Sequence, residues 1–156
     1  MCDYSLMSIP NRLAVAGEDL VIHRFGEGAL GMASASDLRL REERRQAGGR
    51  GFWTRVKEFF SAQDAIPAVC IPPGTRLIVR DIPLNLQFGC SLRGDFEEAV
   101  FTQLTAAINS FRDAVRFKNG SEVLLNRFVE GQRVRVLDVS SGEEQETSPR
   151  ELVRVG

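Results

Sequence analysis

Cys2 is the residue whose position most directly suggests chemistry, because it follows Met1 in the opening stretch MCDYSLM. Methionine aminopeptidase removes a first methionine that precedes a small residue such as cysteine. The new N-terminus would carry a thiol next to an α-amino group with a pKa of about 7.7–8.0. That amine can serve as the base for a thiol nucleophile, or both groups can chelate a soft metal ion. Cys2 is therefore the candidate for a thiol-dependent enzyme or a metal binder.

A structural role for Cys2 is the favoured alternative. A short N-terminal strand would tie Cys2 and Tyr4 into a sheet, with the thiol packed as a small hydrophobic group. Nothing in the flanking sequence supplies an oxyanion hole, which nucleophilic catalysis on a carbonyl group would need.

His23 is the only histidine in the chain, so any imidazole chemistry depends on it. It lies in LVIHRF, and strand alternation gives that segment two faces, one with Leu20, Ile22 and Arg24 and one with Val21, His23 and Phe25. A histidine among apolar side chains is typically packed and hydrogen-bonded. A catalytic role would require Cys2 to approach His23 and use it as a base.

No other pattern predicts a catalytic or metal site. Cys2, Cys70 and Cys90 with His23 would suffice for tetrahedral zinc, but no CxxC pair is present and the four residues are widely scattered. The glutamates occur as adjacent doublets that read as solvated faces, and the GxSxG, HExxH and phosphate-loop motifs are missing. We predict no cofactor, and the sequence leans away from an enzyme.

The stretch after AGGRG predicts an amphipathic helix over residues 52–62, extending to Gln63. Its apolar residues fall within about 120° of a helical wheel; they are Phe52, Trp53, Val56, Phe59 and Phe60. The opposite face carries Thr54, Arg55, Lys57, Glu58 and Ser61. Arginine dominates residues 39–57, unlike the flanking sequence. We therefore interpret residues 36–64 as an insertion.

The apolar face of this helix could pack on the protein's own core, on a partner or on a bilayer. Each large side chain would contribute about 1.5–3 kcal/mol on burial, and arginines near an anionic surface add about 1 kcal/mol each. Glycines and basic charge favour an external protein, bound through Phe52, Trp53, Arg55, Val56, Phe59 and Phe60. An anionic membrane is the second choice. Nucleic acid is not expected, because aromatic residues are not interleaved with the basic ones.

The remaining sequence predicts one α+β domain over residues 1–156, a small β-rich rolled sheet or SH3-like barrel. Strands are expected on both sides of Gly17–Asp19, in GALGMAS, on both sides of the type II turn PPGT, in NLQFGC, in a type I′ hairpin at Asn119–Gly120, in QRVRVLDV and in ELVRV. A core helix is expected over about 95–111, with Phe96, Val100, Leu104, Ala107, Ile108 and Phe111 on one face.

Composition limits the classes of protein that the chain can be. Twenty basic and 21 acidic residues give a net charge of −1, so no global field attracts nucleic acid. No run approaches the roughly 20 apolar residues of a membrane span, and no signal peptide is recognisable. We therefore expect a cytoplasmic protein with reduced cysteines, and association with the periphery of the inner membrane is the alternative location.

The segments 2–5, 68–75 and 113–137 resemble small bacterial proteins that open with Met-Cys-Asp-Tyr-Ser. In those proteins a central AVC…PPGT-like strand and turn precede a C-terminal hairpin ending in EGQ…VL. The matching pieces cover less than half of the chain, and no activity is established for that family. The resemblance thus implies a layout, which residues 36–64 interrupt.

Three functional hypotheses follow. The first is a non-enzymatic interaction module, such as an accessory subunit of a larger bacterial complex, that docks through residues 52–63. The alternative is a thiol-dependent enzyme or metal binder that uses Cys2 after removal of Met1. The third is peripheral membrane association through the same predicted helix.

Overall fold

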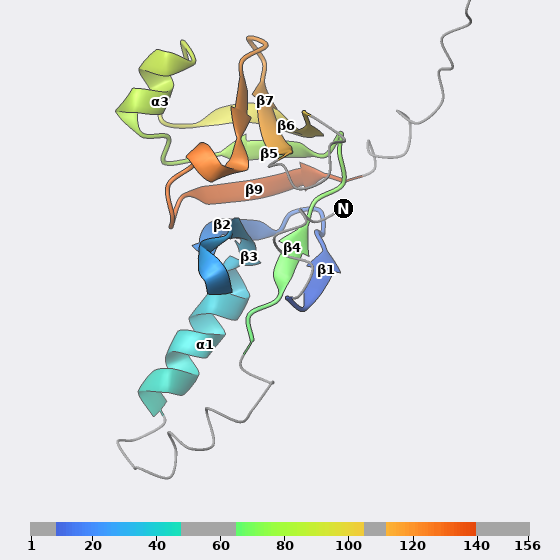
Figure 1. Cartoon of the computed structure of the whole chain (residues 1–156), viewed down its shortest axis with the longest axis vertical. Coiled ribbons are helices and arrows are strands. Elements are labelled where there is room, and N and C mark those ends of the chain that lie inside the picture. Colours follow the sequence, from blue (N-terminus) through green and yellow to red (C-terminus); the bar gives the residue numbers. More distant parts are fainter. Residues whose placement is uncertain (1–8, 48–64, 105–111, 140–156) are drawn as a thin grey trace, which may run out of the picture.

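The computed structural model describes residues 9–47, 65–104 and 112–139, which contain one mixed sheet of nine strands (Figure 1). The strands are β1 (Asn11–Leu13), β2 (Asp19–Arg24), β3 (Leu30–Ser34), β4 (Ala68–Cys70), β5 (Arg76–Val79), β6 (Glu97–Gln103), β7 (Asp113–Phe117), β8 (Glu122–Leu124) and β9 (Arg133–Asp138). Their order is β1-β4-β3-β2-β9-β5-β6-β7-β8. Only the β1–β4 pair is parallel among these ladders.

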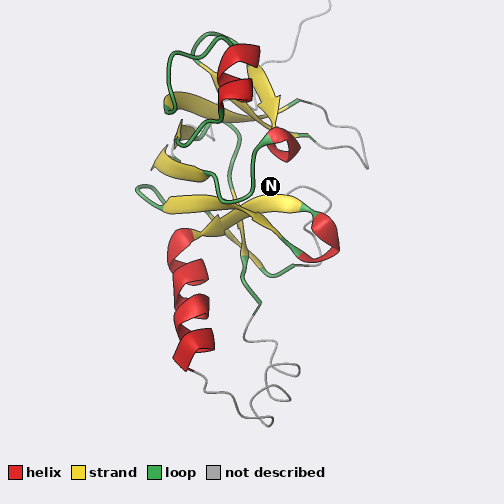
Figure 2. Cartoon of the chain, turned by 90° about the vertical axis from the view of Figure 1, so that its left-hand side faces the viewer, coloured by secondary structure: helices red, strands yellow, loops and turns green. Residues whose placement is uncertain are grey.

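The helices lie at opposite ends of the sheet. Helix α1 (Ala35–Ala47) follows β3 and projects downward, whereas α3 (Leu84–Gly89) lies beside the β5–β6 end (Figures 1 and 2). Two short 3₁₀ helices, η2 (Gly26–Gly28) and η4 (Leu125–Arg127), lie in connections. The predicted α+β, β-rich class is therefore confirmed. The strand order ends at β1 and β8, so the sheet does not close into a barrel within the described residues.

Alternation along the strands gives the sheet its main core. Leu20 and Ile22 of β2, Leu77 and Val79 of β5, and Val136 of β9 are all fully buried in one cluster. On the other face, Ala33 of β3 and Ala68 of β4 form a smaller cluster with Phe25 and Ile66, which lie just outside the strands, and Leu38 of α1 packs against it. The base of α1 thus covers the second face of the sheet.

The predicted core helix over 95–111 is wrong, because residues 97–103 form β6. This strand pairs with β5 on one side and β7 on the other, with Ala99 opposite both Leu77 and Phe117. Ala99 and Phe101 point into the main core, whereas Phe96 and Leu104, on the apolar face of the predicted helix, are exposed. Residues 105–111 lie outside the described residues. Pairing with two neighbours has overridden the helical spacing.

NLQFGC, predicted as a strand, is also corrected, because residues 84–89 form α3. The carbonyl of Pro83 accepts hydrogen bonds from the amides of Leu86 and Gln87 at 3.0 Å each, which starts the helix. The side chain of Gln87 donates to the carbonyl of Ile82 at 2.6 Å. These local bonds favour a helix over the strand that the short alternation predicts.

The two predicted turns have different outcomes. In PPGT, Gly74 has a φ of 89° and the amide of Thr75 donates to the carbonyl of Pro72 at 3.2 Å, as a type II turn requires. The β7–β8 hairpin is confirmed, but only Gly120 has a positive φ, of 88°. Its turn is therefore type I with a glycine bulge, because type I′ needs a positive φ at Asn119 as well.

The strand assignment of β6 predicts a large loss of stability for one phenylalanine substitution and almost none for another. Phe101 is 2% exposed, so Phe101→Ala should lower the free energy of unfolding by about 3–5 kcal/mol. Phe96 is 67% exposed, so Phe96→Ala should change it by no more than about 0.5 kcal/mol. Urea denaturation of the two variants measures both values. The helix over 95–111 would be supported instead if Phe96→Ala were the more damaging change.

Candidate functional site

Helix α1 belongs to an excursion between two strands that are neighbours in the sheet. Residue Ala33 of β3 pairs directly with Ala68 of β4, although residues 35–67 separate the strands along the chain. The chain leaves the sheet into α1 and returns through Ala65–Pro67. The helix therefore stands out from the body (Figures 1 and 2).

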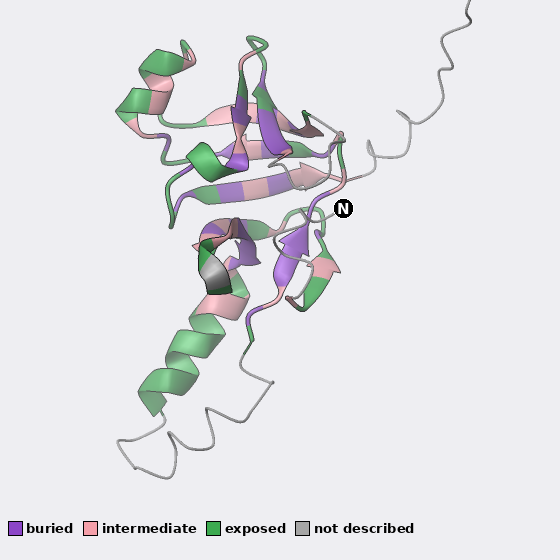
Figure 3. Ribbon diagram, viewed as in Figure 1, coloured by how far each residue is buried: buried purple, intermediate pink, exposed green. Residues whose placement is uncertain are grey.

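Within the part of the chain that the structure describes, the contacts that hold α1 to the body come from its first turn. Leu38 packs against the smaller apolar cluster, and Asp37 forms an ion pair with Arg12 of β1 at 3.6 Å. Arg12 also hydrogen-bonds Glu18, a contact that raises the pKa of the guanidinium. From Arg39 to Ala47 every residue is exposed, and no residue of the helix is buried (Figure 3).

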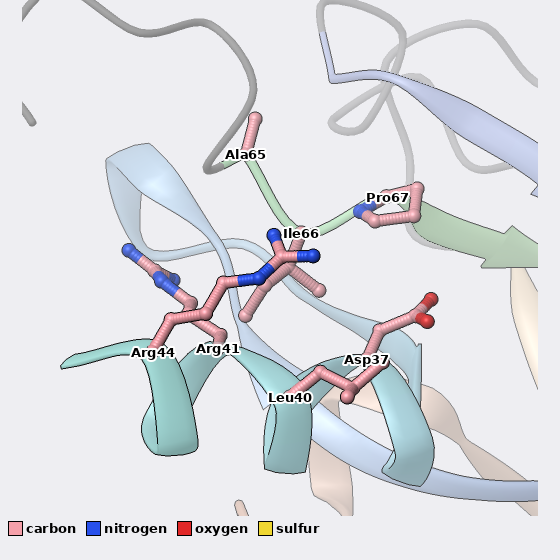
Figure 4. A pocket seen from close by; sticks show the side chains of 7 residues that line it. All are labelled: Asp37, Leu40, Arg41, Arg44, Ala65, Ile66 and Pro67. Atoms are coloured by element: carbon pink, nitrogen blue, oxygen red, sulfur yellow. The ribbon is translucent and has the colours of Figure 1, made fainter. Parts of the chain in front are cut away.

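A cleft of about 190 Å³ lies between α1 and the returning chain (Figure 4). One helical stripe lines one side, since positions 37, 40, 41 and 44 follow the i, i+3, i+4, i+7 spacing. The other side is Ala65, Ile66 and Pro67. Leu40 and Ile66 supply an apolar floor, and Arg41 and Arg44 supply positive charge. In Figure 4 the guanidinium of Arg44 extends over Ile66, while that of Arg41 is directed away from it.

The arginines of α1 differ in whether they are paired. Arg39 lies 3.8 Å from Glu43 and Arg45 lies 3.5 Å from Glu42, so two arginines are partly neutralised within the helix. Arg41 and Arg44 form no ion pair or hydrogen bond within the described residues. Both guanidiniums therefore keep their donors for an anion.

A second hollow, on strands β6 and β7, is lined by charged side chains that already form ion pairs. It has a volume of about 100 Å³ and is lined by Glu98, Arg116 and Lys118, among others. Arg116 pairs with Glu122 at 2.7 Å, and Lys118 pairs with Glu98 at 2.5 Å. Hydrogen bonds from Lys118 and Arg76 lower the pKa of Glu98 to about 2. Since each of these charges already has a partner, the α1 cleft is the better candidate for binding an ionic ligand.

His23, a candidate catalytic residue, lies in β2 and is half-buried. Its ring meets that of Phe25 edge to face at 4.9 Å between centroids, so the predicted shared face is confirmed. Burial lowers the pKa of His23, Glu130 raises it, and the positive charge of Arg41 lowers it. A lowered pKa keeps the imidazole neutral at neutral pH.

The cysteines differ from the expectation that all are reduced. Cys70 is disulfide-bonded, so that expectation is wrong for this residue, whereas Cys90 is free. Cys2, the candidate nucleophile, lies outside the described residues. Within the ranges 9–47, 65–104 and 112–139, no group of three His, Cys, Asp or Glu side chains is arranged to hold a metal ion.

The predicted partner-binding residues are not among those that the structure describes. Phe52, Trp53, Arg55, Val56, Phe59 and Phe60 all fall within 48–64, so the amphipathic helix stays a prediction. None of the described helices combines the length and the apolar character needed to cross a membrane.

Sequence reasoning recognised Arg41 and Arg44 as part of a basic stretch but missed the cleft. The signal was present in the spacing of Asp37, Leu40, Arg41 and Arg44, which places them on one helical face. The other wall could not be found this way, because Ile66 reaches α1 only through the pairing of β3 with β4.

No protein-family model, curated protein or solved structure matches the chain.

The surroundings of His23 predict how its pKa responds to substitution. In the native protein it should titrate below its ordinary value of 6.5; Arg41→Gln should raise the pKa, and Glu130→Gln should lower it. The unfolded chain then binds the proton more readily, so stability should fall as the pH drops below about 6.5. NMR titration of the single imidazole measures the pKa directly. A pKa at or above 6.5, or one unaffected by Arg41→Gln, contradicts the proposed environment.

Proposed function

We propose that the chain is a non-enzymatic protein-interaction module that docks a partner protein through the excursion formed by residues 35–67. One observation carries this proposal: a helix of 13 residues, placed between two neighbouring strands, contributes no buried residue to the body. Amphipathic helices of globular proteins are normally held by burial of one face. An exposed helix with unpaired arginines is better suited to an external partner.

The sequence of residues 52–63 supports the same proposal. Its phenylalanines and Trp53 would provide apolar anchors of the kind that dominate protein interfaces. Helix α1 and these residues belong to one connection, so a partner would meet the arginines and the apolar residues together. In this proposal α1 supplies charge complementarity and residues 52–63 supply apolar area.

The structure suggests that the body can fold without most of the excursion. Removing residues 37–64 leaves Ala35, Ser36, Ala65, Ile66 and Pro67 between β3 and β4, and five residues are a normal hairpin length. Ile66, which is buried in the smaller cluster, is retained. The losses are the partly buried Leu38 and the ion pair of Arg12 with Asp37.

A chain lacking residues 37–64 should therefore remain folded and lose its partner. We expect the free energy of unfolding to fall by no more than about 1–2 kcal/mol. Urea denaturation and NMR spectra check the fold. Crosslinking in the source cell, comparing full-length and shortened chains, checks the partner.

A matched variant, Phe59→Ser with Phe60→Ser, keeps the full length and should lose the same crosslinked protein. Failure of the shortened chain to fold would place α1 in the core and end the proposal. Retention of the partner by the folded shortened chain would also end it, as would recovery of the full-length chain on anionic vesicles with no protein partner.

A further inference from the structure

We infer that the α1 cleft binds an acidic polypeptide segment in which an apolar side chain stands next to carboxylates. The apolar side chain would lie on Leu40 and Ile66, and the carboxylates would meet Arg44 and Arg41. This inference rests on the proposed function, because it gives the chemistry of the partner that the excursion docks.

The floor of the cleft suits one apolar side chain. Leu40 is 46% exposed although it is a large hydrophobic residue, so covering it removes apolar surface from water. Ile66 beside it is fixed in the smaller cluster and provides a rigid contact. At about 190 Å³ the cleft is smaller than the roughly 300–1,000 Å³ typical of small-molecule and cofactor sites. It therefore fits a side chain better than a cofactor.

The placement of the guanidiniums favours two carboxylates over a single anion. Arg44 extends over Ile66, while Arg41 is directed away from it, so the two groups do not converge on one point (Figure 4). Each arginine can form a bidentate pair with a separate carboxylate. Neither has to release a described partner first, unlike Arg39 and Arg45. Acidic residues on both sides of an apolar one match this arrangement.

The charges around the cleft favour a carboxylate ligand over a nucleic acid. A phosphate backbone needs a continuous basic track, whereas Glu42 and Glu43 interrupt the arginines of α1. Among the described residues, those that line the cleft include no aromatic side chain on which a base could stack. The chain as a whole has a net charge of −1.

Two segments of the chain itself are alternative occupants. Residues 48–64 carry Arg50, Arg55 and Lys57 against Glu58 and Asp64, so their charge does not complement the arginines of the cleft. Residues 143–146 carry three glutamates and could compete for them. The occupant that we propose is an external acidic segment. A chain ending at Val139 lacks residues 143–146, so it shows whether those glutamates occupy the cleft instead.

The test uses a fluorescent peptide, Asp-Leu-Asp-Glu-Leu-Asp, and anisotropy with the full chain. Arg41→Gln with Arg44→Gln should weaken binding by at least about tenfold, because both proposed ion pairs are lost. The matched control, Arg39→Gln with Arg45→Gln, removes the same charge from the same helix and should leave the affinity within about twofold. Replacing the peptide's leucines by serine, or its acidic residues by their amides, should also weaken binding.

Several results would overturn the inference. The first is a loss of affinity in the Arg39→Gln, Arg45→Gln control as large as that in the Arg41→Gln, Arg44→Gln variant. The second is that the amide peptide binds as tightly as the acidic one, and the third is that an RNA oligonucleotide binds more tightly through the same arginines. The fourth is that the acidic peptide binds only when the chain ends at Val139. The proposed function has a separate test, since it depends on loss of the cellular partner when residues 37–64 are removed. If the peptide fails and that loss is still observed, only the present inference is refuted.

Discussion

The pairing of β3 with β4 is the constraint on which the arrangement of this protein depends. Because Ala33 lies opposite Ala68, everything between Ser34 and Ala68 must leave the sheet and return to nearly the same place. The main core is completed by β2, β5, β6, β7 and β9, none of which needs α1. The helix is therefore free to project, held by Leu38 and by the ion pair of Asp37 with Arg12.

The projection of α1 away from the body also explains why two arginines of the cleft have no ion-pair partner among the described residues. Several charged side chains of the described body form ion pairs between neighbouring strands, as do Arg76 of β5 with Glu98 of β6 and Arg116 of β7 with Glu122 of β8. On α1 the glutamates at 42 and 43 reach Arg45 and Arg39, whereas the stripe that faces Ile66 carries two arginines with no such partner. Exposed arginines are fully hydrated and contribute little to folding. In the docking role that we propose, these two arginines recognise an anionic group of the partner.

The sequence allowed most strands of the body to be predicted, because β2, β5 and β9 alternate between buried and open positions. The segment of β6 was wrongly predicted as a helix, because Phe96, Val100 and Leu104 have helical spacing. Pairing with β5 and β7 makes it a strand. Helix α1 was not predicted as a helix because charge on all sides leaves no apolar stripe. The cleft was missed because Ile66 is distant in sequence and near only in the fold.

Hydrogen exchange of the native protein tests most directly whether α1 is an appendage. A helix segment whose residues are all exposed should open locally, so the amides of Arg39–Ala47 should exchange far faster than those of β2, β5 and β9, which form the centre of the sheet. Protection of those helix amides as strong as that of β9 would mean that α1 is part of the cooperative core. In that case the arginine-lined cleft would be a structural joint and the proposed docking role would be contradicted.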